Sequence, residues 1–255
     1  NIDILHNNCV GVVIPCYNEE NRLLSNEFVE FIDNNHGYTL CFVNDGSTDN
    51  TLEVLKKLQK DREGFISILN CEKNGGKAEA VRLGMLHLAN QAQLDYIGFL
   101  DADLSTNFDD FIHLVNTISN SNYKVVSGSR ITRMGADIEK QAARSIISKI
   151  INFIIRLTLG MDFNDTQCGA KIMTKEIVNK TFQAKFITKW LFDVEIFMRM
   201  RNIFGLEETK KMLCEKPLNR WIHIDGSKLS FKDSMKIMGQ IYKIFIYYRL
   251  KKIKI

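Results

Sequence analysis

The chain has 255 residues, of which 45% are hydrophobic and 25% charged, so it can bury a full core and is neither disordered nor fibrous. This length favours one large α/β domain, with at most a small appendage, over two independent domains. The formal net charge of +4 is unevenly distributed, because residues 226–255 carry Asp233 against Lys228, Lys232, Lys236, Lys243, Arg249, Lys251, Lys252 and Lys254. This cationic tail is either a solvated helix face or a site for an anionic partner, such as lipid headgroups or nucleic acid.

The cysteines and the chain start favour a cytoplasmic protein. The six cysteines show neither a CxxC motif nor metal-ligand spacing, which is typical of reduced thiols. The first ten residues lack the basic region and apolar stretch of a signal peptide. The longest mostly apolar run, residues 146–159, falls short of the roughly 20 residues needed to span a bilayer.

Short apolar, β-branched runs alternate with helical patterns through the first half of the chain. This alternation predicts βαβ units and a mainly parallel sheet. The predicted strands are residues 10–14, 40–43, 65–69, 96–100 and 125–127, and the predicted helices between them are residues 51–62, 77–90 and 109–119.

A further helix is predicted over about residues 141–160. Its polar stripe of Ser145, Lys149, Asn152 and Arg156 leaves an apolar face too wide to pack on one sheet. Such a helix is either fully buried in the core or lies in a membrane interface. We therefore expect a domain over residues 1–230 that includes this helix, followed by a basic amphipathic C-terminal helix over residues 231–255.

Polar clusters follow the predicted strands where each of them ends. PCYNEE follows the first strand, NDGSTD the second and DADLS the fourth, while NGGK lies between the third strand and the next helix. Ligands of open α/β sheets bind outside the carboxyl ends of the strands, so these segments are expected to converge on one site.

The DADLS segment predicts a site for a divalent metal. Asp101 and Asp103 would repel one another unless a cation lay between them, and Mg²⁺ or Mn²⁺ prefers such oxygen ligands. Asp45 could accept the imide N–H of a uracil, and Lys77 could balance a phosphate charge. The GxxxxGK[ST] and GxGxxG motifs are both absent, which argues against P-loop and dinucleotide-binding proteins.

The motifs VVIPCYNEENRL, FVNDGSTDNT, NGGKAEAVRLGM, FLDADLST, SGSR, NDTQCGAKIM, WLFDVEIFMR and WIHIDGSKL occur in this order. Together they resemble the GT-A family 2 glycosyltransferases, and more narrowly the dolichyl- and polyprenyl-phosphate glucosyl- and mannosyltransferases. The resemblance implies a Rossmann-like α/β sheet flanked by helices, with amphipathic helices near the C-terminus. It also implies transfer of a hexose to polyprenyl or dolichyl phosphate at the inner face of a membrane.

The resemblance further implies roles for individual residues. The donor would be bound by Pro15, Tyr17, Glu19, Asp45, Lys77, Asp101 and Ala102. The metal on the diphosphate would be ligated by Asp103, together with Asp101. The lipid phosphate would be bound by Arg130, Arg144, Ser148, Ser227 and Lys228, with Asp165 and Gln167 beside the reacting centre.

Several functions remain as hypotheses. We favour an inverting, metal-dependent hexosyltransferase that uses a UDP-sugar, most simply UDP-glucose, with an anionic membrane surface as partner. The alternatives are a GDP-mannose-dependent enzyme, a family 2 transferase with a soluble glycan acceptor, and a non-enzymatic lipid- or nucleic-acid-binding module. Nucleic acid is disfavoured because no basic groove with interleaved aromatics is evident. The oligomeric state is left open.

Overall fold

The computed structural model describes residues 8–130, 150–219 and 231–250, with side chains described from residue 235 in the last range. Its strands are β1 (Val10–Cys16), β2 (Tyr38–Asp45), β3 (Ile66–Cys71), β4 (Tyr96–Leu100), β5 (Val125–Ser129), β6 (Ala170–Thr174) and β7 (Leu213–Pro217). Its helices are α1 (Ser25–Asn34), α2 (Thr51–Gln59), α3 (Lys77–Ala89), α4 (Phe108–Ser119), α6 (Lys175–Thr181), α7 (Phe192–Phe204), α8 (Leu206–Met212), α9 (Phe231–Ile244) and a final π-helical segment, η1 (Phe245–Leu250). Residues 150–159 are also helical.

The strands form one sheet in the order β3-β2-β1-β4-β6-β5-β7. Strands β1 to β4 pair in parallel, and β7 is parallel to β5, whereas β6 runs antiparallel to both β4 and β5. The prediction of a mainly parallel sheet is therefore confirmed. Because β1, β2 and β4 are neighbours, the loops that follow them leave the sheet side by side.

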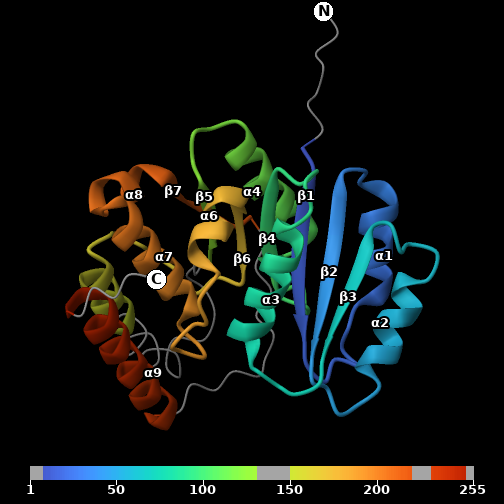
Figure 1. The fold of residues 1–255 in the computed structure, drawn as a ribbon, viewed down its shortest axis with the longest axis horizontal. Coiled ribbons are helices and arrows are strands. Elements are labelled where there is room, and N and C mark those ends of the chain that lie inside the picture. Colours follow the sequence, from blue (N-terminus) through green and yellow to red (C-terminus); the bar gives the residue numbers. More distant parts are fainter. Residues whose placement is uncertain (1–7, 131–149, 220–230, 251–255) are drawn as a thin grey trace, which may run out of the picture.

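Helices cover both faces of the sheet, and each face has its own hydrophobic cluster. Helices α1, α2 and α4 pack on one face, around Phe28, Phe42 and Phe111. Helices α3, α6 and α7 pack on the other, around Phe99 and Phe197. Figure 1 shows the resulting three layers, with α3 in front of the sheet and α4 behind it.

Strands β6 and β7 had no counterpart among the predicted strands. The β6 sequence AKIMT contains Lys171, which interrupts the apolar pattern, yet this side chain is completely buried. The β7 sequence LCEKP contains two charged residues and ends in Pro217, and it lies at the edge of the sheet, where proline is tolerated. Tertiary contacts, rather than local propensity, place these strands in the sheet.

The C-terminal helix packs on the body of the protein. On α9, the side chains of Ile237, Ile241 and Ile244 are buried in the same cluster as Phe99. Tyr248 of η1 follows them into the core and is 1% exposed. This apolar face explains the 3.6-residue periodicity of the segment.

Candidate functional site at the strand ends

Two loops meet at Asp45, the last residue of β2: the loop that follows β2 and the loop between β3 and α3. Its Oδ1 accepts a hydrogen bond from the backbone N–H of Gly75 at 2.8 Å, and its Oδ2 accepts one from Gly76, also at 2.8 Å. Gly46 has a φ of +65°, and a Cβ there would lie 2.4 Å from the backbone nitrogen of Asn74. The sequence NDG followed by NGG thus locks the β3–α3 loop against the end of β2. A carboxylate has about four lone-pair positions, so Asp45 keeps acceptor capacity beyond these bonds.

The loop after β1 is fastened to the loop after β2. The backbone N–H of Asn18 donates to the Ser47 hydroxyl at 3.0 Å, and that of Glu19 donates to the Thr51 hydroxyl at 2.8 Å. Asn18 has a φ of 53°, a left-handed conformation that asparagine adopts more readily than most residues. The arrangement leaves Tyr17 45% exposed at the rim of the site, where its ring is accessible to a ligand.

Glu19 carries its charge in a partly desolvated position. Burial raises the pKa of its carboxyl group, and the nearby charge of Asp103 adds to this effect, against the opposing influence of Arg22. Glu19 Oε1 accepts a hydrogen bond from Arg22 at 2.9 Å. The loops after β1 and β4 therefore bring two carboxylates close enough to interact, a pattern typical of functional sites.

The two carboxylates of DADLS have different surroundings. Asp101 forms an ion pair with Lys77, with 2.5 Å between Oδ1 and Nζ. Partial desolvation would lower the pKa of Lys77, but the Asp101 charge and hydrogen bond raise it overall. Asp103 is exposed, and its Oδ1 accepts a hydrogen bond from the Ser105 backbone at 2.9 Å. Leu104, directly after Asp103, adopts an uncommon φ of 52°, so the tight turn stores some strain at this edge of the sheet.

This geometry fits a divalent metal held jointly by the protein and a diphosphate. In the part of the chain that the structure describes, no cluster of three or more His, Cys, Asp or Glu side chains could hold a metal. Mg²⁺ in nucleotide sites commonly takes one or two carboxylates and completes its shell with phosphate oxygens and water. The exposed Asp103 carboxylate can supply such a ligand, whereas Asp101 is already paired with Lys77.

Asp165 and Arg130 form the second half of the candidate site. Asp165 Oδ2 accepts hydrogen bonds from Arg130 Nε at 2.7 Å and from the Arg130 backbone N–H at 3.0 Å, while Oδ1 accepts one from Nη2 at 2.9 Å. The backbone N–H of Gln167 donates to Oδ1 at 3.2 Å. Burial would raise the pKa of Asp165, but Arg130 outweighs it and holds that pKa below its usual range. Asp165 is therefore a stable anion and a weak base.

Two residues contribute to the site although no role was predicted for them. A Cβ on Gly169 would lie 1.9 Å from Asp101 Oδ2, so the backbone of the DTQCG segment packs directly against the first carboxylate of DADLS. The glycine that ends the DTQCG motif is the sequence feature that could have predicted this close approach. Glu215 accepts hydrogen bonds from the backbone N–H groups of Asn164 and Asp165, at 2.9 and 2.5 Å. Glu215 lies in β7, which was not predicted as a strand, and no local motif around it indicates a functional role.

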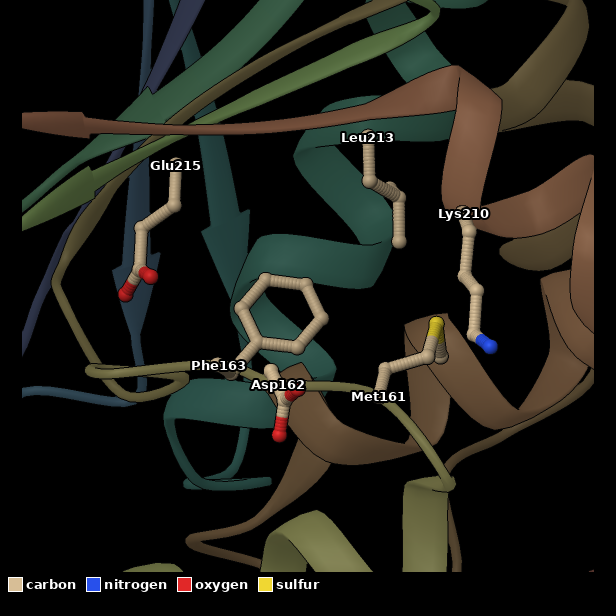
Figure 2. Close-up of a pocket in the computed structure, with 6 residues that line it drawn as sticks. All are labelled: Met161, Asp162, Phe163, Lys210, Leu213 and Glu215. Atoms are coloured by element: carbon tan, nitrogen blue, oxygen red, sulfur yellow. The ribbon is translucent and has the colours of Figure 1, made fainter.

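Glu215 also lines a pocket next to the turn after the 150–159 helix. Figure 2 shows its lining residues, which are Met161, Asp162, Phe163, Lys210, Leu213 and Glu215. Lys210 is paired with Glu207, and Asp162 with Arg156. None of the predicted donor-binding residues lines this pocket, so we take the strand ends as the candidate site.

The remaining predicted residues divide into two groups. Pro15 ends the apolar part of β1, and Ala102 is buried between the two DADLS carboxylates. Arg144, Ser148, Ser227 and Lys228 lie outside the described residues. The structure thus brings together the predicted donor residues, and separately Arg130, Asp165 and the Gln167 backbone.

Comparison with known proteins gives a consistent family. Residues 11–182 match the glycosyl transferase family 2 model. Dolichyl-phosphate β-glucosyltransferase of Drosophila melanogaster is 31% identical over 94% of this chain and 75% of its own length. Dolichyl-phosphate β-glucosyltransferase ALG5A of Trichomonas vaginalis is 31% identical over 94% of this chain and 74% of its own length.

Solved structures confirm the GT-A fold. Glucosyl-3-phosphoglycerate synthase from Mycobacterium tuberculosis, in complex with Mg²⁺ and UDP, aligns with a TM-score of 0.67 at 16% identity, over 93% of this chain and 79% of that one. The same enzyme with Mn²⁺, UDP-glucose and phosphoglyceric acid gives 0.64 at 17%, covering 93% and 80% of the two chains. The resemblance to dolichyl-phosphate glucosyltransferases is also confirmed, and the chain belongs to glycosyl transferase family 2.

Proposed function

We propose that the protein transfers a hexose, with inversion, from a UDP-sugar to polyprenyl or dolichyl phosphate, and that UDP-glucose is the donor. The observation that carries this proposal is the Arg130–Asp165 ion pair. It fixes the Arg130 guanidinium beside the edge of the sheet at which the DADLS carboxylates lie. The names of the relatives support glucose as the sugar and dolichyl phosphate as the acceptor.

The donor would bind across the ends of β1, β2 and β4. Tyr17 offers an exposed ring for the base, and Asp45 offers the lone pairs left free by Gly75 and Gly76. Lys77 lies at the start of α3, where the backbone N–H groups and the helix dipole also favour phosphate. A divalent metal on Asp103 would offset charge on the departing diphosphate.

The acceptor phosphate would bind near Arg130. A phosphate monoester has a second pKa of about 6, so its nucleophilic oxygen is already largely anionic at neutral pH and needs little help from a base. Asp165 would then hold the Arg130 guanidinium towards the acceptor, which agrees with the lowered pKa of Asp165. Arg144, Ser148, Ser227 and Lys228 are assigned to the same phosphate by the family resemblance alone.

We also propose peripheral attachment to the cytoplasmic face of a membrane, and exposed apolar side chains support the attachment itself. The 150–159 helix buries Ile151 and Ile155 but leaves Ile150, Phe153 and Leu157 largely exposed, so the alternative of a fully buried helix is wrong. A second exposed apolar face is formed by Met235, Met238 and Tyr242 of α9 and by Phe245, the first residue of η1. Figure 1 shows α9 at the end of the molecule away from β3. Among the described residues, no helix combines the length and apolar character needed to cross a bilayer.

A panel of donors tests the proposed function. Purified protein is incubated with a short-chain polyprenyl phosphate, Mg²⁺ or Mn²⁺, and UDP-glucose, UDP-galactose, UDP-GlcNAc or GDP-mannose in turn. We expect transfer from UDP-glucose above all others. Transfer from GDP-mannose alone would contradict the donor assignment, and no transfer from any donor would contradict the proposal as a whole.

A substitution tests the metal assignment separately. Asp103→Asn keeps the size of the side chain but removes the charge that would ligate the metal, so most turnover should be lost. Asp109→Asn, which changes an exposed aspartate in the first turn of α4, is the matched control. Near-normal rates in Asp103→Asn, or in wild-type protein with excess chelator, would refute the metal site.

A further inference from the structure

A completely buried ion pair lies directly beneath the candidate site. Lys171 of β6 is 0% exposed, and its Nζ lies 2.7 Å from Oδ1 of Asp193 in the first turn of α7. The ammonium group also lies 5.6 Å from the centre of the Phe99 ring. An isolated charge in such surroundings is strongly unfavourable, so each partner requires the other.

The same ammonium group is bonded to the loop that carries the site. Lys171 Nζ donates a hydrogen bond to the backbone carbonyl of Cys168 at 2.7 Å. The next residue, Gly169, is the one whose backbone packs against the Asp101 carboxylate. The backbone of Gly169 is in close contact with the Asp101 carboxylate, and only a glycine leaves room for this contact. A small shift of the neighbouring Cys168 carbonyl would therefore move the backbone that Asp101 packs against.

The other end of this loop holds the acceptor half of the site. Asp165 is bonded to Arg130, and the Gln167 backbone bonds back to Asp165. The segment 165–169 therefore contacts the Asp101–Lys77 pair at one end and Arg130 at the other. The bond from Lys171 lies between these ends.

Electrostatics connect the buried pair with the donor side. Burial raises the pKa of Asp193, while the charges of Lys171 and, more weakly, Lys77 oppose that rise. The charge of Asp193 likewise favours the protonated form of Lys77. Lys171, Asp193, Lys77 and Asp101 thus form a balanced set of two cations and two anions.

We propose that Lys171 and Asp193 are positioning residues, which hold segment 165–169 at the separation that lets donor and acceptor react. Neither residue would touch a substrate. The inference rests on the proposed function, because it assigns the donor to the Lys77 side and the acceptor to the Arg130 side. It predicts that loss of the pair slows the transfer step and leaves binding of the uridine portion intact.

Removing both charges separates positioning from stability. Lys171→Met alone leaves Asp193 buried without a partner, and its melting temperature should fall by roughly 10 °C. The double variant Lys171→Met/Asp193→Leu replaces the pair with apolar groups of similar size, an exchange that often restores stability. We expect its melting temperature to return to within about 3 °C of wild type while kcat stays at least about tenfold lower, with KM for UDP-glucose within about threefold.

The matched control is the exposed pair Lys56 and Glu53 on α2, whose charged atoms lie 2.9 Å apart, against 2.7 Å in the buried pair. Lys56→Met/Glu53→Gln should leave both melting temperature and kcat unchanged, as expected for a surface ion pair. A wild-type kcat in the stable Lys171→Met/Asp193→Leu variant would overturn the inference, because the pair would then serve stability alone.

Amide hydrogen exchange keeps the test decisive if the double variant is less stable than expected. Measured well below the melting temperature of either variant, exchange should accelerate at residues 165–170 and remain slow in β1 and β2. Unchanged exchange at residues 165–170, or a uniform increase across the sheet, would refute the positioning role. This readout does not require transfer activity, so it separates failure of the inference from failure of the proposed function.

Discussion

The substitution Asp165→Asn distinguishes two roles for Asp165: a clamp, meaning a carboxylate that holds the Arg130 guanidinium in place, and a general base that removes a proton. Asp165 is 9% exposed, and both of its oxygens accept hydrogen bonds from Arg130. An asparagine side chain has one oxygen and one NH₂ group, so a donor of Arg130 would face another donor. The variant thus loses at least one charge-assisted hydrogen bond and leaves the guanidinium without its counter-charge.

The expected magnitude follows from the bond that is lost. A hydrogen bond to a charged group contributes about 1.5–3 kcal/mol. If that bond fixes Arg130 in the transition state, its loss lowers kcat by roughly 10- to 150-fold, at about 1.4 kcal/mol for each factor of ten. The same substitution at Asp162, an exposed residue three positions earlier, should change kcat by less than about twofold.

The pH dependence decides between the two roles. The acceptor phosphate is already ionised above about pH 7, so a higher pH should not restore the activity of Asp165→Asn. We would measure kcat between pH 7 and 9, with and without a small exogenous base such as imidazole. Recovery with rising pH, or rescue by the added base, would show that Asp165 removes a proton and would refute the clamp.

Stability gives an independent check on the same pair. Arg130 holds the folded-state pKa of Asp165 below its value of about 3.9 in unfolded chains. The pair therefore contributes fully above about pH 4, and its contribution is lost as the pH falls through the folded-state pKa. Urea unfolding should show a smaller loss of stability on acidification in Asp165→Asn than in wild type. Equal acid sensitivity of the two proteins would contradict the ion pair.

Three further predictions follow from the described contacts. Tyr248→Phe removes a hydroxyl that donates to a buried carboxylate at 2.7 Å, so the free energy of unfolding should fall by about 1–3 kcal/mol in urea titrations; no loss would contradict that bond. Gly169→Ala should abolish most transfer activity, because its Cβ would collide with a carboxylate, whereas Gly64→Ala has open space and should remain active; equal activity of the two would refute the close approach. Replacing Phe153 and Leu157 with serine should weaken sedimentation with anionic vesicles without lowering the melting temperature, and unchanged binding would refute the membrane face.

Much of the fold could be predicted because its signals are local. The runs that became β1, β2 and β4 are short, apolar and β-branched, and the polar clusters follow them directly. Parallel pairing of neighbouring strands then requires that the clusters meet. The strands β6 and β7 were not predicted, because Lys171 in β6 and Pro217 in β7 interrupt the apolar pattern expected of a strand. Both residues are tolerated for tertiary reasons: Lys171 is buried in an ion pair, and β7 lies at the edge of the sheet.

The connections within the site could not be predicted from local patterns. Arg130 and Asp165 are 35 positions apart, and the ends of the Lys171–Asp193 pair lie on different elements. Charge alone does not show which partners meet across such separations, since every Lys or Arg is a candidate for every carboxylate. Lys77 follows β3 and Asp101 follows β4, for example, so their ion pair depends on the parallel pairing of β3, β2, β1 and β4.

The identity of the acceptor is the most direct test of the proposed function. Purified protein with UDP-[¹⁴C]glucose and Mn²⁺ would be given a short-chain polyprenyl phosphate, 3-phosphoglycerate, or both at equal concentration. Radioactivity would then be measured in the organic and aqueous phases after extraction. The proposed function predicts label in the organic phase, dependent on the lipid phosphate and reduced by Asp103→Asn. Label that remains in the aqueous phase as a phosphoglycerate product, with none on the lipid, would contradict it.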